Sequence, residues 1–147
     1  MRLHELMQEL VGSTAGLNGA TSREKLVGNK PTLIHFWSVS CYMCKDAMRE
    51  INQLRDKYKD DLNVVAVHIP RSVADLNVNL IKSSAEAHHI EQPVFVDNDL
   101  KLRKAFGNKT VPAYYVFDKD GRLRHFQAGG SGMKMLEKRV IRLLDEI

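Results

Sequence analysis

The sequence predicts an α/β fold with a central mixed β-sheet. Apolar runs of strand length alternate along the chain with segments whose apolar residues recur at three- and four-residue steps. The last two runs are joined by DKDG, a tight-turn sequence typical of an antiparallel hairpin. The alternation implies parallel strands with crossover connections, and the hairpin adds an antiparallel edge. Because 147 residues is an ordinary domain size, we expect residues 1–147 to form a single domain.

Composition excludes several classes of protein. Hydrophobic residues make up 44% of the chain and charged residues 27%, as in soluble globular proteins. The net charge is +4, but Lys and Arg are interleaved with Asp and Glu, so we expect no nucleic-acid partner. No apolar run reaches membrane-spanning length, and MRLHELMQELVGST lacks the apolar core of a signal peptide. We therefore expect a cytoplasmic monomer with no membrane partner.

The first thirty residues give weak signals and the next stretch a strong one. LHELMQEL (3–10) suggests a short opening turn or helix, LNG (17–19) a turn, and SREKLVG a short helix ending at Gly28. From Pro31 the pattern sharpens. TLIHFW (32–37) is a continuous apolar run with a proline just before it, which favours a strand covered on both faces.

The middle of the chain predicts a helix, a strand and a second helix. The segment KDAMREINQLRDKY (45–58) has an amphipathic helical pattern, and LNVVAVHI (62–69) is typical of a buried strand. After Pro70, Ser72 and Asp75 have the spacing of a capping box, which predicts a helix start. The expected apolar stripe of that second helix is Val73, Leu76, Leu80 and Ala87.

The last third of the chain predicts two strands in a hairpin, flanked by helices. PVFVD (93–97) indicates a short strand and DLKLRKAF (99–106) a short helix closed by Gly107. Pro112 opens AYYVFD, and DKDG turns the chain into RLRHFQA. A terminal helix is indicated by Met133, Leu136, Val140, Leu143, Leu144 and Ile147.

The only two cysteines, Cys41 and Cys44, follow the first buried strand, at the kind of sheet edge where α/β proteins build sites. As a structural disulfide, a loop this short would stabilise by only about 2 kcal/mol, and a reducing cytoplasm would open it. As a metal site, the pair supplies two of the four ligands that zinc prefers. His88 and His89 are adjacent on an expected helix and point in different directions. We expect no metal and no cofactor.

The third interpretation is a redox centre. Residues three apart on a helix have Cβ atoms about 5–6 Å apart, whereas a relaxed disulfide needs about 3.8 Å. Cys41 must therefore lie just outside the regular helix, and the bond should be easily reduced. A free thiol has a pKa near 8.5, but helix N-terminal amides favour the thiolate of Cys41. We therefore expect Cys41 to attack a substrate disulfide and the more buried Cys44 to resolve the mixed disulfide.

The strand LIHFW, the C-x-x-C at the next helix start and TVPAYYVFD (110–118) with its hairpin and terminal helix together resemble the thioredoxin superfamily. An additional helix and strand between Val73 and Asp97, with the N-terminal extension, resemble the TlpA/ResA-like branch of thiol-disulfide oxidoreductases. The resemblance implies a thioredoxin-like three-layer sandwich, with helices on both faces of the mixed sheet.

The resemblance also implies site residues and partners. Cys41 would be the attacking thiol, Cys44 the resolving one, and Pro112 a cis-proline beside them. The backbone of Val111 would then meet an extended substrate segment, a small case of strand addition. The implied substrates are proteins with disulfides, and the implied activity is cytosolic protein-disulfide reduction with electrons from an unidentified reductase.

Several positions depart from the pattern of this family. Ser40 replaces the usual tryptophan before the first cysteine, and Ala47 stands where ResA-type members have a glutamate. These departures leave the proton acceptor for Cys44 open. His35 is a candidate, since imidazole titrates near neutral pH, but a hydrogen-bonded sheet histidine is the favoured interpretation. Trp37 is expected to pack beneath the cysteines rather than to react.

Two other functions compete with disulfide exchange. Ser38-x-x-Cys41 resembles the T-x-x-C of peroxiredoxins, which suggests a thiol peroxidase, but Ile34 stands where those enzymes have proline. A second thiol three residues away suits exchange better. A redox-inert binding module would need neither thiol. The remaining histidines are interpreted as structural or surface residues: His4, His68 and His125.

Overall fold

The computed structural model describes residues 1–147 and contains a six-stranded sheet with the strand order β1-β4-β3-β2-β5-β6. The strands are β1 (Ala15–Leu17), β2 (Thr32–Trp37), β3 (Asn63–His68), β4 (Val94–Val96), β5 (Ala113–Phe117) and β6 (Leu123–Ala128). The pairs β2–β3 and β3–β4 are parallel. The pairs β1–β4, β2–β5 and β5–β6 are antiparallel. The predicted mixed sheet with a hairpin edge is confirmed.

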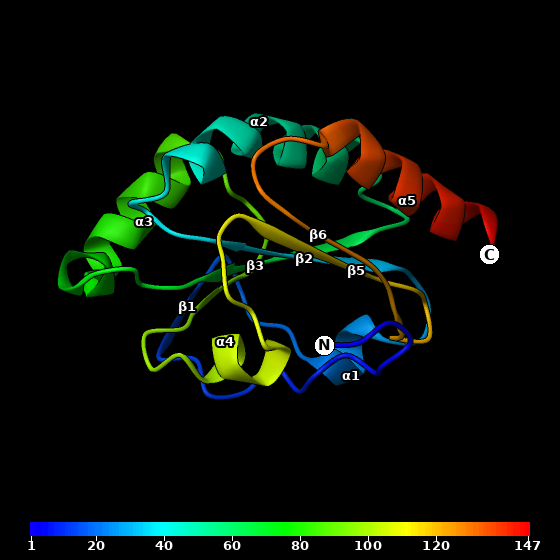
Figure 1. Cartoon of the computed structure of the whole chain (residues 1–147), viewed down its shortest axis with the longest axis horizontal. Coiled ribbons are helices and arrows are strands. Elements are labelled where there is room, and N and C mark those ends of the chain that lie inside the picture. Colours follow the sequence, from blue (N-terminus) through cyan, green and yellow to red (C-terminus); the bar gives the residue numbers. More distant parts are fainter.

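Helices cover both faces of this sheet (Figure 1). They are α1 (Arg23–Leu26), α2 (Tyr42–Lys57), the 3₁₀ helix η1 (Val73–Leu76), α3 (Val78–Ala87), α4 (Lys101–Phe106) and α5 (Met133–Asp145). Helices α2, α3 and α5 lie over one face, and α1 and α4 lie under the other. The expected α/β sandwich, with its inserted helix and strand, is confirmed.

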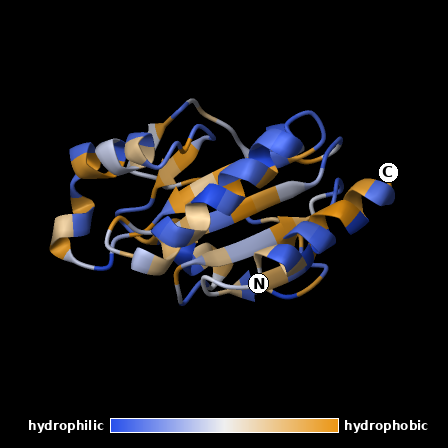
Figure 2. Ribbon diagram, turned by 90° about the horizontal axis from the view of Figure 1, so that it is seen from above, coloured by the Kyte–Doolittle hydropathy of each residue, from blue (hydrophilic) through white to orange (hydrophobic).

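Strand β2 is buried on both faces, as its continuous apolar sequence predicts. Ile34 and Phe36 point into the core shared with α1 and α4. Leu33 and Trp37 point to the other side, into the clusters that contain α2. Figure 2 shows the consequence for sequence pattern: the central strands are largely hydrophobic, whereas hydrophilic and hydrophobic residues alternate along the covering helices.

Strand register places the cysteines at the carboxyl edge of the sheet. Trp37, the last residue of β2, pairs with His68, the last residue of the parallel strand β3. Residues 38–41 then lead directly into α2. Strand β5 begins at Ala113, opposite Phe36, so the segment before β5 starts beside the end of β2. Three chain segments distant in sequence therefore meet at this edge.

The opening segment differs from the expectation of a helix. Residues 3 and 4 form a turn, and no helix follows over 3–10. Leu6 instead forms an antiparallel bridge with Arg122, and the N–H of Met7 donates to the carbonyl of Gly121 at 2.8 Å. The β5–β6 hairpin thus satisfies backbone groups that a helix would have satisfied internally. Strand β1 was not predicted either.

Ser72 is the N-cap residue of η1, so the predicted helix start is confirmed, but the predicted capping box is wrong. Ser72 makes no side-chain capping bond, and the expected single helix is divided into η1 and α3. Asn77 caps α3, its Oδ1 accepting the N–H of Leu80 at 3.1 Å. The predicted stripe is largely solvent-exposed, with Val73 84% exposed and Leu80 45% exposed. The buried residues of α3 are Ile81 and Ala85.

Candidate active site

Cys41 and Cys44 form a disulfide at the start of α2, with Cα atoms 5.3 Å apart. Cys41 is the N-cap residue, in extended conformation with φ −92° and ψ 105°, and Cys44 lies within the first turn. The prediction that Cys41 lies just outside the regular helix is therefore confirmed. Its Sγ accepts the N–H of Cys44 at 3.1 Å, which takes the place of a capping oxygen.

The disulfide lies at the boundary between core and surface. Cys41 and Cys44 are only 3% and 2% exposed, and both pack in the cluster that contains Trp37. Tyr42 and Met43, the two residues between them, are 77% and 50% exposed. The disulfide is therefore bordered on the surface by two exposed apolar side chains.

The loop before Cys41 is tied to β3 and to the segment after it. The hydroxyl of Ser38 donates to the carbonyl of Ile69, and the N–H of Val39 donates to Nε2 of His68 at 3.1 Å. The hydroxyl of Ser40 donates to Oδ2 of Asp75 at 2.6 Å. These three bonds fix the path by which the chain enters α2.

His68 and Asp75 contribute to the site although the sequence did not single them out as functional. Burial lowers the pKa of His68 to about 4, with Asp75 acting in the opposite direction, so the imidazole is neutral at neutral pH. Because Nε2 accepts from Val39, the ring proton is on Nδ1. Strand register could have identified His68 from the sequence. It is the last residue of the strand that runs parallel to the strand before C-x-x-C, so it lies beside the end of that strand.

His35 occupies a fully buried position on β2. Burial, with a smaller contribution from Arg55, lowers its pKa to about 3. Its Nε2 lies 2.8 Å from the side-chain amide nitrogen of Gln92. A neutral imidazole with so low a pKa is a weak base near pH 7, and these contacts favour the structural interpretation. Trp37, 1% exposed, packs against the cysteines as expected.

The segment before β5 completes the site. The Val111–Pro112 peptide bond is cis. Val111 is partly buried and packs against the cluster that holds both cysteines, and Pro112 is buried. The carbonyl of Pro112 accepts the N–H of Gly129, whereas the backbone groups of Val111 have no partner within the chain. Among the predicted residues, Cys41, Cys44, Trp37 and Val111 thus share one cluster.

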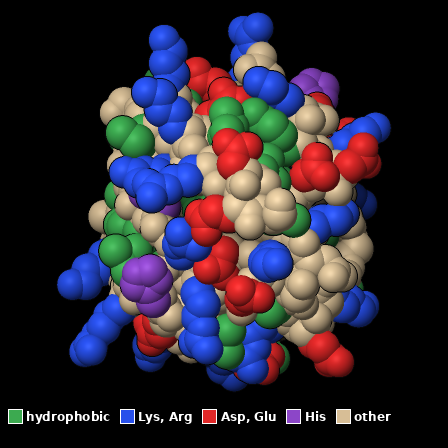
Figure 3. Space-filling model, turned by 90° about the vertical axis from the view of Figure 1, so that its right-hand side faces the viewer, with side chains coloured by type: hydrophobic (Ala, Val, Ile, Leu, Met, Phe, Trp, Pro, Cys, Tyr) green, Lys and Arg blue, Asp and Glu red, His purple; other side chains and the backbone are tan.

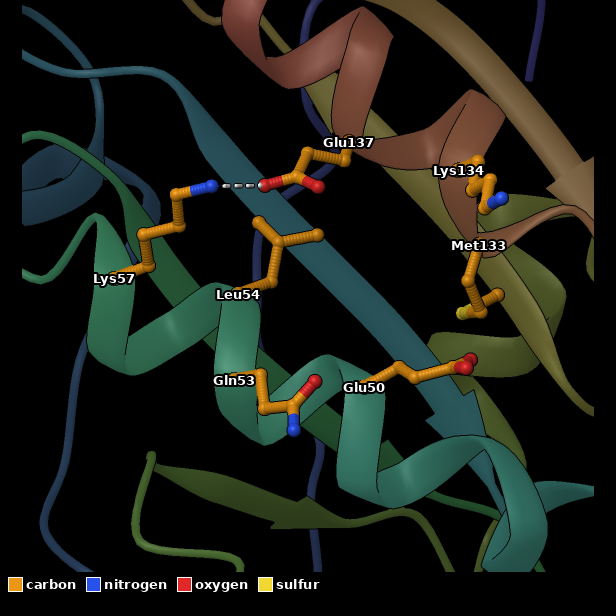
Figure 4. Close-up of a pocket in the computed structure, with 7 residues that line it drawn as sticks. All are labelled: Glu50, Gln53, Leu54, Lys57, Met133, Lys134 and Glu137. Carbon is orange, nitrogen blue, oxygen red and sulfur yellow. Dashed lines mark hydrogen bonds and ion pairs between the residues drawn. The ribbon is translucent and has the colours of Figure 1, made fainter.

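A separate hollow of about 270 Å³ lies between α2 and α5 (Figure 4). The side chains of Lys57 and Glu137 bridge it at 3.1 Å, and Leu54 and Met133 form its apolar part. It contains neither cysteine, and its charges are mutually compensated, so it has no reactive group for exchange. No group of three or more His, Cys, Asp or Glu side chains is arranged to hold a metal ion.

Comparisons with known proteins agree with this geometry. The sequence pattern of the AhpC/TSA family matches residues 10–126. The chain is 64% identical over 146 residues to the thiol-disulfide oxidoreductase YkuV of Bacillus subtilis (strain 168), covering 99% of each chain. It is 26% identical over 122 residues to the thiol-disulfide oxidoreductase ResA of Bacillus thuringiensis, covering 83% of this chain and 68% of that one.

A solved structure has the same architecture. The solution structure of a thioredoxin-like protein in the oxidized form superposes with a TM-score of 0.93 at 64% identity, covering 99% of each chain. Together with the disulfide at the start of α2, this likeness defines the class as thioredoxin-like thiol-disulfide oxidoreductases. More particularly, the chain belongs to the AhpC/TSA family. No helix in it combines the length and apolar character needed to cross a membrane.

Asp75→Ala is expected to slow disulfide exchange by up to roughly tenfold and to destabilise the fold by about 1–3 kcal/mol. The substitution removes the acceptor of both the Ser40 hydroxyl and the N–H of Arg71, so the path into α2 loosens. We would measure kcat/KM and urea unfolding, with Asp60→Ala on the exposed surface as control. Unchanged kcat/KM in a destabilised Asp75→Ala protein would show that the tether does not position Cys41.

Proposed function

We propose that the protein is a cytoplasmic reductase of protein disulfides, with Cys41 as attacking thiol and Cys44 as resolving thiol. The Cys41 thiolate attacks one sulfur of a substrate disulfide, and the other substrate sulfur leaves as a thiolate and takes a proton. The Cys44 thiolate then attacks Cys41 and displaces the second substrate sulfur. The substrate gains two electrons, and the protein is left with the Cys41–Cys44 disulfide. A separate reductase restores the dithiol.

The observation that carries this proposal is the position of Cys41 as N-cap of α2. Its Sγ already accepts the N–H of Cys44 at 3.1 Å, and α2 runs for 16 residues behind it. Free N–H groups and the positive end of the helix dipole favour an anion at this position. Cys44 lies inside the first turn without this advantage, which supports Cys41 as the attacking sulfur and Cys44 as the resolving one.

The surroundings support an extended polypeptide as substrate. The unpaired backbone groups of Val111 offer one N–H and one C=O beside the cysteine cluster. An extended segment can pair with them as an additional strand, which holds its disulfide against Cys41 without demanding a particular sequence. The exposed Tyr42 and Met43 provide apolar contact on the other side.

The surroundings of Ser38 argue against the peroxidase alternative. In the T-x-x-C comparison, the hydroxyl of Ser38 would have to assist a peroxide at Cys41. That hydroxyl is fully buried and donates to the backbone carbonyl of Ile69. Cys44 lies close enough to condense with Cys41 directly, which suits thiol–disulfide exchange.

A redox titration of the Cys41–Cys44 couple tests the direction of the reaction. A cytoplasmic reductant should have a potential well below about −200 mV, whereas an oxidant would lie near −120 mV. The titration would use buffers of reduced and oxidised dithiothreitol, with alkylation and mass spectrometry to count free thiols. We expect the reducing value, accompanied by reduction of insulin disulfides. A potential near that of an oxidant would overturn the reductase assignment.

A further inference from the structure

We propose that a basic cleft beside Val111 selects substrates whose disulfide is flanked by acidic residues. This inference rests on the proposed function and names the substrate class within it. The cleft is about 500 Å³ in volume and is distinct from the hollow between α2 and α5. Its lining is Ile69, Pro70, Arg71, Arg103, Lys109, Thr110 and Val111.

The charge of this cleft is uncompensated. Three of its seven lining residues are cationic, and none is acidic. None of these three cations forms an ion pair with a carboxylate. The Asp75 carboxylate accepts the backbone N–H of Arg71 and the Ser40 hydroxyl, but it forms no ion pair with the Arg71 guanidinium. The cleft therefore presents a local positive potential.

A second hollow is also lined by cationic residues without an acidic one, but its lining of Arg124, His125, Arg139, Arg142 and Leu143 includes neither cysteine nor Val111. Figure 3 shows the end of the molecule where the chain terminates, and there Lys and Arg side chains are intermingled with Asp and Glu. A concave surface lined by one sign of charge attracts and orients ligands of the opposite sign.

The location of the cleft relative to the disulfide makes this charge relevant to exchange. On one wall, Nη1 of Arg71 lies 3.5 Å from the carbonyl of Ser40, the residue before Cys41. On the other wall is Val111, which packs against the cysteine cluster. A substrate strand paired with Val111 and joined to Cys41 would continue into the space between Arg71, Arg103 and Lys109. Acidic side chains on that strand would meet the cations there.

The occupant that fits is an extended polypeptide rather than a small anion. The same cleft contains the unpaired N–H and C=O of Val111, which recognise a backbone, and apolar surface from Ile69 and Pro70. Exposed rim charges act mainly on association rate and discriminate against like-charged partners. Selectivity should therefore show in kcat/KM and decline as salt concentration rises.

The test compares three cystine peptides that are identical except for residues flanking one cysteine, which are Glu, Gln or Lys. The reduced protein is expected to reduce the Glu peptide roughly tenfold faster than the Gln peptide in kcat/KM at low salt, and the Lys peptide slowest. The double variant Arg103→Gln/Lys109→Gln should bring the Glu-to-Gln ratio close to one. The control Lys25→Gln/Lys59→Gln removes two exposed cations outside the cleft and should keep the ratio.

The outcomes separate this inference from the proposed function. Equal reduction of all three peptides, or an equal loss of selectivity in the cleft and control variants, would overturn the acidic-substrate inference and leave the reductase intact. Failure to reduce any of them would overturn both. A selectivity that resists high salt would also contradict the inference, because exposed charges are screened.

Discussion

Replacing Cys44 by serine is expected to convert the protein from an enzyme that turns over into one that stops at a covalent adduct. Cys41 retains its N-cap position and can still attack a substrate disulfide. The serine hydroxyl cannot displace the substrate sulfur, so the mixed disulfide persists. Turnover should fall by on the order of 10³-fold, and close to one substrate chain should remain bound per protein molecule.

Cys41→Ser is the matched variant and should behave differently. Cys44 lies inside the first turn of α2 and lacks the N-cap position of Cys41, so neither turnover nor a stable adduct is expected. Non-reducing electrophoresis and mass spectrometry of both variants with a disulfide protein would measure the adduct. If Cys41→Ser formed the adduct instead, the assigned roles would be reversed. If Cys44→Ser turned over like the parent protein, the two-thiol scheme would be wrong.

The sequence identifies the cysteine site well because its position follows from local patterns. The buried strand TLIHFW, the amphipathic helix after it and the C-x-x-C between them place Cys41 at a strand–helix junction. That junction is enough to predict an N-cap sulfur, and the structure has it. Likewise, DKDG between two apolar runs predicts the β5–β6 hairpin, because short-range turn chemistry determines the pairing.

The tethers around the site could not be predicted because they join residues far apart in sequence. Asp75 has the spacing of a capping residue, yet its carboxylate binds Ser40, 35 positions away. The segment after Ser72 forms only the short helix η1, a second helix start at Asn77 opens α3, and the predicted stripe is largely exposed. The opening segment shows the same effect, since the edge of the hairpin offers Leu6 and Met7 backbone partners. In both segments, long-range contacts outweighed the local preference of the sequence for a helix.

His35 and His68 are expected to make the fold strongly sensitive to acid. Their folded-state pKa values are about 3 and about 4, because burial disfavours the charged imidazolium. In the unfolded chain both would titrate near 6.5. As the pH falls below that value, the two imidazoles become protonated in the unfolded state but stay neutral in the native state, so unfolding becomes more favourable. As far as these two histidines are concerned, the free energy of unfolding is therefore highest above about pH 6.5 and decreases as the pH falls toward 4.

The expected loss is large relative to ordinary protein stability. Each histidine contributes about 1 kcal/mol per pH unit in this window, so stability should fall by about 5 kcal/mol between pH 7 and pH 4.5. Domains of this kind are stable by only about 5–15 kcal/mol. Asp97 acts in the opposite direction, because burial raises the pKa of its carboxyl group and so favours proton uptake by the native state as the pH falls. Asp56 and Glu137 are more exposed, so their ion pairs add little.

Urea unfolding at several pH values would measure this slope, and substitutions would assign it. His35→Gln and His68→Gln should each remove about half of the acid sensitivity, because each removes one proton taken up on unfolding. Glutamine at position 68 can still accept the N–H of Val39, which limits disturbance of the loop before Cys41. His4→Gln, at an exposed position, serves as control and should leave the slope unchanged. A slope equal in all four proteins would contradict the assignment and place the acid sensitivity in the carboxylates.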